Sequence, residues 1–110
     1  MSQIPRDDAQ THSAPLLELF DVLGRRWALR IVWELGADAL TYRELAATIP
    51  DMSTSVLTQR LRELRAAGLA EHERGAGYRL TSRGRELRAH VESLREWAAR
   101  EGFASGRATR

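Results

Sequence analysis

The sequence predicts a mainly helical domain that carries one small β-hairpin. Its 110 residues are 43% apolar and 29% charged, a composition that allows one modest hydrophobic core and is ordinary for a folded domain. Apolar residues recur at helical spacing in five segments. This periodicity changes after Gly68, where two short strand-like stretches flank a glycine turn.

The N-terminal third predicts two helices after a flexible arm. Residues 1–13 are polar and contain Pro5, so we expect them to form the arm. A helix over 16–23 should end at Gly24, and a second helix, which starts near Trp27, should end at Gly36. The apolar residues that define the two helices are Leu16, Leu19, Phe20, Leu23, Trp27, Ile31 and Leu35.

The middle of the chain predicts two helices joined by a turn. Thr41 and Glu44 have the spacing of a capping box, which opens a helix from Tyr42 to about Thr48. The next helix, over 54–67, has two candidate N-caps, Ser53 and Asp51. Because only the turn at residues 49–52 separates them, these helices form a helix-turn-helix.

A hairpin and a long helix complete the domain. The hairpin comprises residues 69–73, a turn at 75–77 and a return strand at 78–80. Thr81 should cap a last helix that runs to about Glu101. We therefore expect a winged helix-turn-helix domain over 14–101, between the arm and a flexible tail at 102–110.

The sequence argues against an enzyme. His12, His72 and His90 have no metal-ligand spacing, and no phosphate loop, nucleophile elbow or paired-carboxylate motif is present. The chain contains no cysteine, which excludes disulfides and thiolate chemistry within it. We therefore predict no catalytic residue, metal or cofactor. Since no signal peptide or membrane span is apparent, we expect a cytoplasmic protein.

The helix at 54–67 carries the features expected of a DNA-reading helix. At 100° per residue, Leu57, Leu61 and Leu64 share one side, which must face the core. Glutamine and arginine on the opposite side can pair with adenine and guanine in the major groove, although any surface helix also carries such residues. The candidate DNA-contacting residues in and beside this helix are Ser53, Thr54, Ser55, Thr58, Gln59, Arg60 and Arg62.

Positive charge is concentrated in the second half of the chain. Residues 1–52 contain five arginines and eight acids (5 − 8 = −3), whereas residues 53–110 contain twelve arginines and seven acids (12 − 7 = +5). Guanidinium groups gathered in this way favour a polyanion as partner. We expect the hairpin and the start of the last helix to bind the DNA backbone through Arg74, Arg79 and Arg83, together with Arg60.

The chain resembles the HxlR-type family of bacterial winged-helix transcriptional regulators, which are relatives of the MarR group. The matching stretches are Pro15-Leu16, Leu23-Gly-Arg-Arg-Trp27, Tyr42-Arg-Glu-Leu45, Met52 to Leu64, Gly68-Leu69, Tyr78 to Gly84, and Trp97. Two positions depart from the family pattern. Ala14 stands where many members have a reactive cysteine. The hairpin is also shorter than the family's usual wing, so the resemblance does not decide whether it reaches the minor groove.

The resemblance implies a homodimer that binds a near-palindromic operator in double-stranded DNA. Its interface would be formed by the apolar stripes of the first and last helices, which comprise Leu16, Leu19, Phe20, Leu23, Leu87, Val91, Leu94 and Trp97. Trp27 and Trp33 are expected mainly in the core, with an effector pocket as the alternative. Because Trp33 projects about 120° from the stripe of Trp27, Ile31 and Leu35, a further alternative for it is the partner subunit or a cavity between helices. The predicted function is a sequence-specific transcriptional regulator without thiol-redox control. The alternative is a winged-helix module for protein–protein or small-molecule binding with weak DNA binding.

Overall fold

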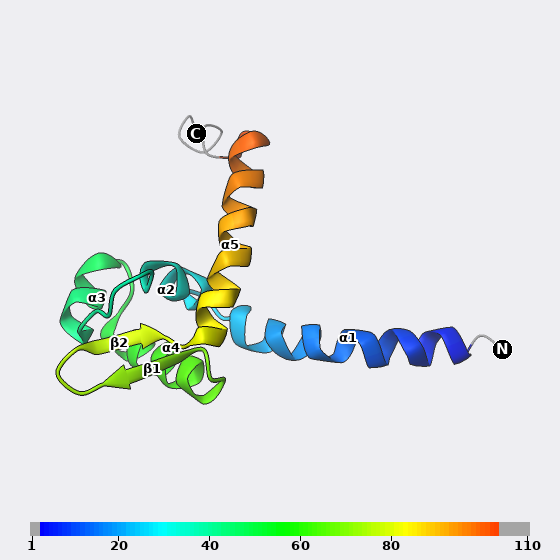
Figure 1. Cartoon of the computed structure of the whole chain (residues 1–110), viewed down its shortest axis with the longest axis horizontal. Coiled ribbons are helices and arrows are strands. Elements are labelled where there is room, and N and C mark those ends of the chain that lie inside the picture. Colours follow the sequence, from blue (N-terminus) through cyan, green and yellow to red (C-terminus); the bar gives the residue numbers. More distant parts are fainter. Residues whose placement is uncertain (1–2, 104–110) are drawn as a thin grey trace.

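The helices and hairpin form a winged helix-turn-helix with two projecting helices. The computed structural model describes residues 3–103, with side chains from residue 13 onward. In chain order the elements are α1 (Gln3–Leu23), α2 (Ala28–Glu34), α3 (Tyr42–Thr48), α4 (Thr54–Ala66), β1 (Ala70–Glu73), β2 (Gly77–Leu80) and α5 (Ser82–Arg100). In Figure 1, α2, α3, α4 and the hairpin form the body, from which α1 and α5 extend in different directions.

The first helix is longer than the sequence indicates. We expected an arm over residues 1–13, but α1 begins at Gln3 and continues through Pro15 to Leu23. The polar segment before residue 14 has no apolar stripe, so periodicity gives no signal for a helix there. At the other end, α5 stops at Arg100, next to the expected boundary, and residues 104–110 of the expected tail lie outside the described residues.

The helix-turn-helix forms as the capping pattern predicts. The Thr41 hydroxyl accepts the Glu44 N–H, and the Glu44 carboxylate accepts the Thr41 N–H, which completes the capping box of α3. Ser53, rather than its rival Asp51, caps α4 by accepting the Val56 N–H at 3.2 Å. These caps satisfy helix N–H groups that would otherwise lack partners, and so they fix where each helix begins.

The core lies between the helix-turn-helix and the hairpin. The three leucines that the projection assigns to the core, Leu57, Leu61 and Leu64, are at most 2% exposed, which confirms the assignment. They pack with Ile31 and Leu35 from the second helix region, each fully buried. This packing leaves the opposite face of α4 on the surface.

The hairpin is joined by a third short stretch that periodicity does not reveal. β1 and β2 are antiparallel, with Glu71 opposite Arg79. Leu40 forms an isolated bridge with Tyr78 through two backbone hydrogen bonds of 2.7 and 2.8 Å. Gly77, at φ 110°, makes this approach possible, because a Cβ there would collide with the Leu40 carbonyl. The bridge places the start of α3 beside β2.

Candidate nucleic-acid interface

The outer face of α4 exposes the polar side chains expected to contact DNA. Ser55, Thr58, Gln59 and Arg62 are all exposed. Ser53 is occupied as the N-cap, and its hydroxyl lies 3.3 Å from that of Ser55. Thr54 is exposed at the first position of the helix, next to this cap. The N-terminal half of the face therefore presents short hydroxyl side chains and one amide.

Tyr42 from α3 fixes the hydrogen-bonding role of Thr58. The Tyr42 hydroxyl donates to the Thr54 carbonyl at 2.8 Å, and it lies 2.9 Å from the Thr58 hydroxyl. Since the single Tyr42 proton goes to Thr54, Thr58 must donate in the second bond. The Thr58 oxygen is then left as an acceptor, which suits an exocyclic amine of adenine or cytosine better than a phosphate.

Gln59 is held in place by its two neighbours along the helix. Arg62 donates to its amide oxygen at 3.1 Å, and its amide nitrogen donates to Glu63 at 2.9 Å. The hydrogen bond from Gln59, supported by the hydrogen bond and charge of Arg60, lowers the pKa of the Glu63 carboxyl. Glu63 therefore remains ionised, and the orientation of the Gln59 amide is fixed by contacts within the protein.

Arg60 does not lie with the DNA-facing residues. Its side chain is 15% exposed and pairs with Glu63 at 2.5 Å. Its Nε also donates to the Arg26 carbonyl at 3.2 Å, which ties α4 to the loop before α2. In that loop Trp27 has an unusual φ of 79° and packs against the core. These contacts direct two of the Arg60 donors inward, so the structure does not group Arg60 with the exposed polar face of α4, and its contact with the DNA backbone stays a prediction.

The hairpin is electrically neutral rather than basic. Arg79 pairs across the strands with Glu71 at 2.8 Å and with Glu73 at 2.5 Å. The hydrogen bond with Glu71 and the charge of Glu73 raise the pKa of Arg79. With Arg74 at the turn, the four charges sum to zero (2 − 2 = 0). Arg74 is exposed and has no ion pair among the described residues, so it is the hairpin's available cation.

Arg83 lies at the open end of the hairpin, away from its turn. Its guanidinium is beside the Gly68 backbone and lines a cavity of about 450 Å³ with α1 residues that include Pro15 and Leu19. The structure therefore groups Arg83 with the junction of α1 and α5, and it does not bring Arg83 together with Arg74.

A small basic cavity between α4 and β2 contains residues that the sequence reading missed. It has a volume of about 160 Å³, and its lining residues are Tyr42, Thr58, Leu61, Arg62, Arg65 and Tyr78. Arg65 could have been found from its position three residues after Arg62, which places both on one edge of the helix. Tyr78 could not, because the Leu40 bridge that positions it is non-local.

The residues expected at a dimer interface form an exposed apolar surface along α1 and α5. Leu16, Phe20, Leu94 and Trp97 are 47–58% exposed, although all are large and apolar. Leu19, Leu23, Leu87 and Val91 are half-buried and line a groove of about 320 Å³ with Leu29 and His90. The groove is therefore lined by the C-terminal part of α1, by α2 and by α5.

The two tryptophans proposed for an effector pocket have different surroundings. Trp27 packs against the core with the Arg26 guanidinium 5.0 Å from its ring centre. Trp33 lies under the Arg88 guanidinium at 4.1 Å, and Arg88 also donates to the Trp33 carbonyl at 2.9 Å. Neither tryptophan lines the cavities of about 160, 320 and 450 Å³.

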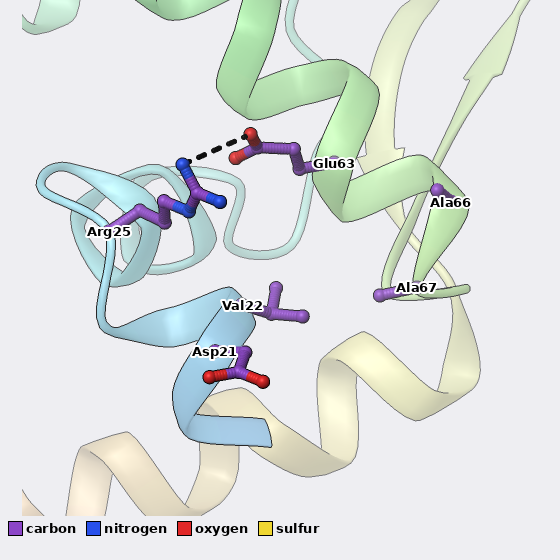
Figure 2. Close-up of a pocket in the computed structure, with 6 residues that line it drawn as sticks. All are labelled: Asp21, Val22, Arg25, Glu63, Ala66 and Ala67. Atoms are coloured by element: carbon purple, nitrogen blue, oxygen red, sulfur yellow. Dashed lines mark ion pairs between the residues drawn. The ribbon is translucent and has the colours of Figure 1, made fainter. Parts of the chain in front are cut away.

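A separate cavity of about 370 Å³ lies between α1 and α4. Figure 2 shows Val22 of α1 facing the end of α4, while Arg25 and Glu63 point toward one another along one side. The Arg25–Glu63 pair spans 3.9 Å. Glu63 thus links this cavity to Gln59, its hydrogen-bond partner on α4.

The described residues form neither a membrane-crossing helix nor a cluster of metal ligands. Within residues 3–103, no helix combines the length and apolarity needed to cross a bilayer. In the same range, no three side chains of His, Cys, Asp or Glu are grouped as metal ligands would be.

Comparison with other proteins places the chain in a family. A family model for an HxlR-like helix-turn-helix matches residues 22–104. The uncharacterised HTH-type transcriptional regulator YdzF of Bacillus subtilis is 27% identical over 100 residues, which are 84% of this chain and 92% of YdzF. The HTH-type transcriptional regulator YodB of the same bacterium is 31% identical over 85 residues, which are 72% and 76% of the two chains.

Solved structures agree with this placement. The crystal structure of quinone-bound YodB from B. subtilis superimposes with a TM-score of 0.72 and 30% identity, over 78% of this chain and 96% of that chain. The reduced form of YodB gives a TM-score of 0.69 and 29% identity, over 76% and 88% of the two chains. Because the family model covers most of the chain, this protein belongs to the HxlR-like helix-turn-helix family of transcriptional regulators.

Proposed function

We propose that this protein is a sequence-specific regulator that binds a near-palindromic operator in double-stranded DNA as a homodimer. The observation that carries the proposal is the exposed face of α4, where Gln59 is oriented by Arg62 and Glu63. A pre-oriented amide can form a bidentate pair with adenine. Ser55 and Thr58 lie on the same surface and supply further acceptors for base edges.

Dimerisation would explain the apolar surface of α1 and α5. Burial of large exposed side chains such as Phe20 and Trp97 against a second copy would stabilise the dimer. Aromatic residues of this kind often dominate interface energetics. A two-fold dimer presents two copies of α4, so the operator should contain two half-sites related by the same symmetry. The half-sites should lie about 10 base pairs apart, or a multiple of that spacing.

Any signal that this protein senses should act without a thiol of the chain. The comparison structures include YodB in quinone-bound and reduced forms, so they do not by themselves support the absence of redox control. The support comes from composition, because the 110 residues contain no cysteine and Ala14 precedes Pro15. A small-molecule effector that binds without a covalent bond to sulfur stays within the proposal.

The neutral hairpin favours the second candidate function. A winged helix that binds a protein or small molecule needs no basic wing, and here Arg79 is balanced by Glu71 and Glu73. Such a module would bind DNA weakly and without base preference. The two candidates therefore differ in whether the purified protein selects a sequence.

Selection from random duplexes tests the proposal. The full-length protein should enrich duplexes that share one motif with two symmetric half-sites. Enrichment without a shared motif would favour the alternative module. A motif without two-fold symmetry would retain DNA reading and overturn the homodimer.

A further inference from the structure

The surface between α4 and the hairpin contains a notch that is suited to a phosphate group. Of the four cavities described here, the one of about 160 Å³ is lined by two arginines, Arg62 and Arg65, and by no carboxylate. The other three are lined by an acidic residue or almost wholly by apolar ones. A basic, concave site of this size is electrostatically complementary to a single anion.

Three side chains around the notch keep donors that a ligand can use. Arg65 is exposed and has no ion pair among the described residues, and Arg62 uses one nitrogen to reach Gln59. The Tyr78 hydroxyl likewise has no hydrogen-bond partner in the described part of the chain, while its ring is supported by His72 at 4.7 Å. Arginine forks and a phenolic O–H are donors that phosphate oxygens accept well.

The architecture positions this notch on the path of a DNA strand. The two grooves of a duplex are separated by a sugar–phosphate backbone. If α4 occupies the major groove and the hairpin lies toward the adjacent minor groove, one backbone must cross the seam between them. The Leu40–Tyr78 bridge holds β2 beside the start of α3, and Tyr42, Arg65 and Tyr78 line the same cavity.

We propose that Arg62, Arg65 and Tyr78 form a binding site for one backbone phosphodiester of the operator. The inference rests on the proposed function and adds residues to it. Tyr42 is a positioning residue, since its proton goes to the Thr54 carbonyl and its oxygen accepts from Thr58. The notch, rather than the neutral hairpin, then supplies the phosphate contact next to the reading helix.

Two substitutions test the site without disturbing the core. Arg65→Gln removes the charge of an exposed residue, and Tyr78→Phe removes a hydroxyl and keeps the ring. Arg65→Gln should weaken binding to a selected operator and to a random duplex by a similar factor, about tenfold, and flatten the salt slope by about one unit. Arg100→Gln, the same charge change at the far end of α5, is the control and should alter neither slope nor preference.

A methylphosphonate scan locates the contact. In this scan a neutral methylphosphonate linkage replaces one operator phosphate at a time. At one position in each half-site, the replacement should lower the affinity of the wild type about tenfold but leave the affinity of Arg65→Gln almost unchanged. Tyr78→Phe should shrink the effect at that same position. Such coupling assigns the phosphate to the notch, and thermal unfolding of each variant checks that the fold is retained.

Other outcomes separate this inference from the proposed function. Selective, salt-dependent binding by the wild type with no Arg65-dependent position in the scan would overturn the notch and leave DNA reading intact. Saturable shifts of the Tyr78 NMR signals with inorganic phosphate alone, in the absence of such a position, would assign the notch to a free phosphorylated ligand and also overturn it. No duplex binding by the wild type would overturn both.

Discussion

Gln59 is the residue whose chemistry most directly links α4 to base recognition. Its amide is fixed between Arg62 and Glu63 at hydrogen-bonding distances of 3.1 and 2.9 Å. Gln59→Ala should therefore relax base preference at one position in each half-site, with about 1–3 kcal/mol of discrimination lost. Binding to operator variants that differ at single base pairs measures this loss, and random duplexes should be bound almost as before.

Arg74 provides the contrast, because it is exposed at the hairpin turn and has no ion pair among the described residues that would orient it for reading bases. Arg74→Ala should weaken all duplexes to a similar degree and flatten the salt slope by about one unit. If Arg74→Ala changed base preference while Gln59→Ala lowered affinity uniformly, the two roles would be reversed.

Glu63 gives the chain a pH-dependent element of stability. Its carboxyl pKa is lowered in the folded protein, first by the hydrogen bond from Gln59 and then by Arg60. Its contribution is therefore present above the unfolded-state pKa and is lost as pH falls through the lower folded-state value, at and below about pH 4. Glu63→Gln should therefore lower the free energy of unfolding by up to about 1 kcal/mol at pH 7.

Urea unfolding at several pH values measures this cost. The difference between wild type and Glu63→Gln should shrink as pH falls from 5 toward 3, while Glu86→Gln, at an exposed carboxylate with no ion pair among the described residues, should show little difference at either end. A difference for Glu63→Gln that stays constant over this range would assign its role to packing.

At the scale of elements, the hairpin holds its own counter-ions. Glu71 and Glu73 both pair with Arg79, and all three side chains are 46–48% exposed. Glu73→Gln should leave the hairpin with a net charge of +1 and strengthen binding to any duplex by several-fold, since surface charge contributes to affinity without base preference. Affinity for random duplexes at two salt concentrations measures the effect.

The same charge change elsewhere provides the control for the hairpin. Glu96 is exposed near the C-terminal end of α5 (Ser82–Arg100), whereas the hairpin joins the N-terminal end of that helix, so Glu96→Gln should have a much smaller effect. Equal strengthening by both substitutions would mean that net charge, rather than the hairpin, controls binding.

The elements that could be predicted from the sequence are those defined by local interactions. The caps at Thr41, Ser53 and Thr81 each involve a residue three positions away, so spacing alone reveals them. The leucine stripe of α4 likewise follows from the helical period. The start of α1 at Gln3 had no such signal, because a polar helix has no apolar period.

The site was only partly predictable, because charge pairing depends on tertiary contacts. Arg60 turns inward because the loop containing Arg26 lies next to α4, a contact between residues 34 positions apart. Arg79 is neutralised because the hairpin register places it opposite Glu71. Counting arginines in this region therefore overestimated the positive charge that the hairpin offers to DNA.

At the scale of the whole molecule, α5 carries an exposed aromatic residue that the proposed homodimer would bury. Trp97 is 47% exposed, and its ring lies 5.5 Å from that of Phe103. Trp97→Ala should weaken the dimer by about 2–4 kcal/mol. Light scattering over a dilution series measures the change, and a wild type that stays a folded monomer at micromolar concentration would contradict the proposed assembly.

Because the chain contains no cysteine, we expect its affinity for DNA to be insensitive to thiol oxidants. Diamide oxidises thiols, so it should not change the affinity of this protein for its operator. Met52, near the turn of the helix-turn-helix, is 6% exposed, so oxidation of its thioether should be slow. Reversible release of DNA by diamide, restored by reductant, would contradict the prediction.

The most direct test of a dimeric, sequence-reading regulator is a salt titration of binding to a selected duplex and to a scrambled one. Two protomers should bind each selected duplex, with log K falling linearly against log salt, and the selected sequence should be preferred by about 10³-fold or more. Equal affinity for both duplexes, or a selected complex with one protomer, would contradict the account.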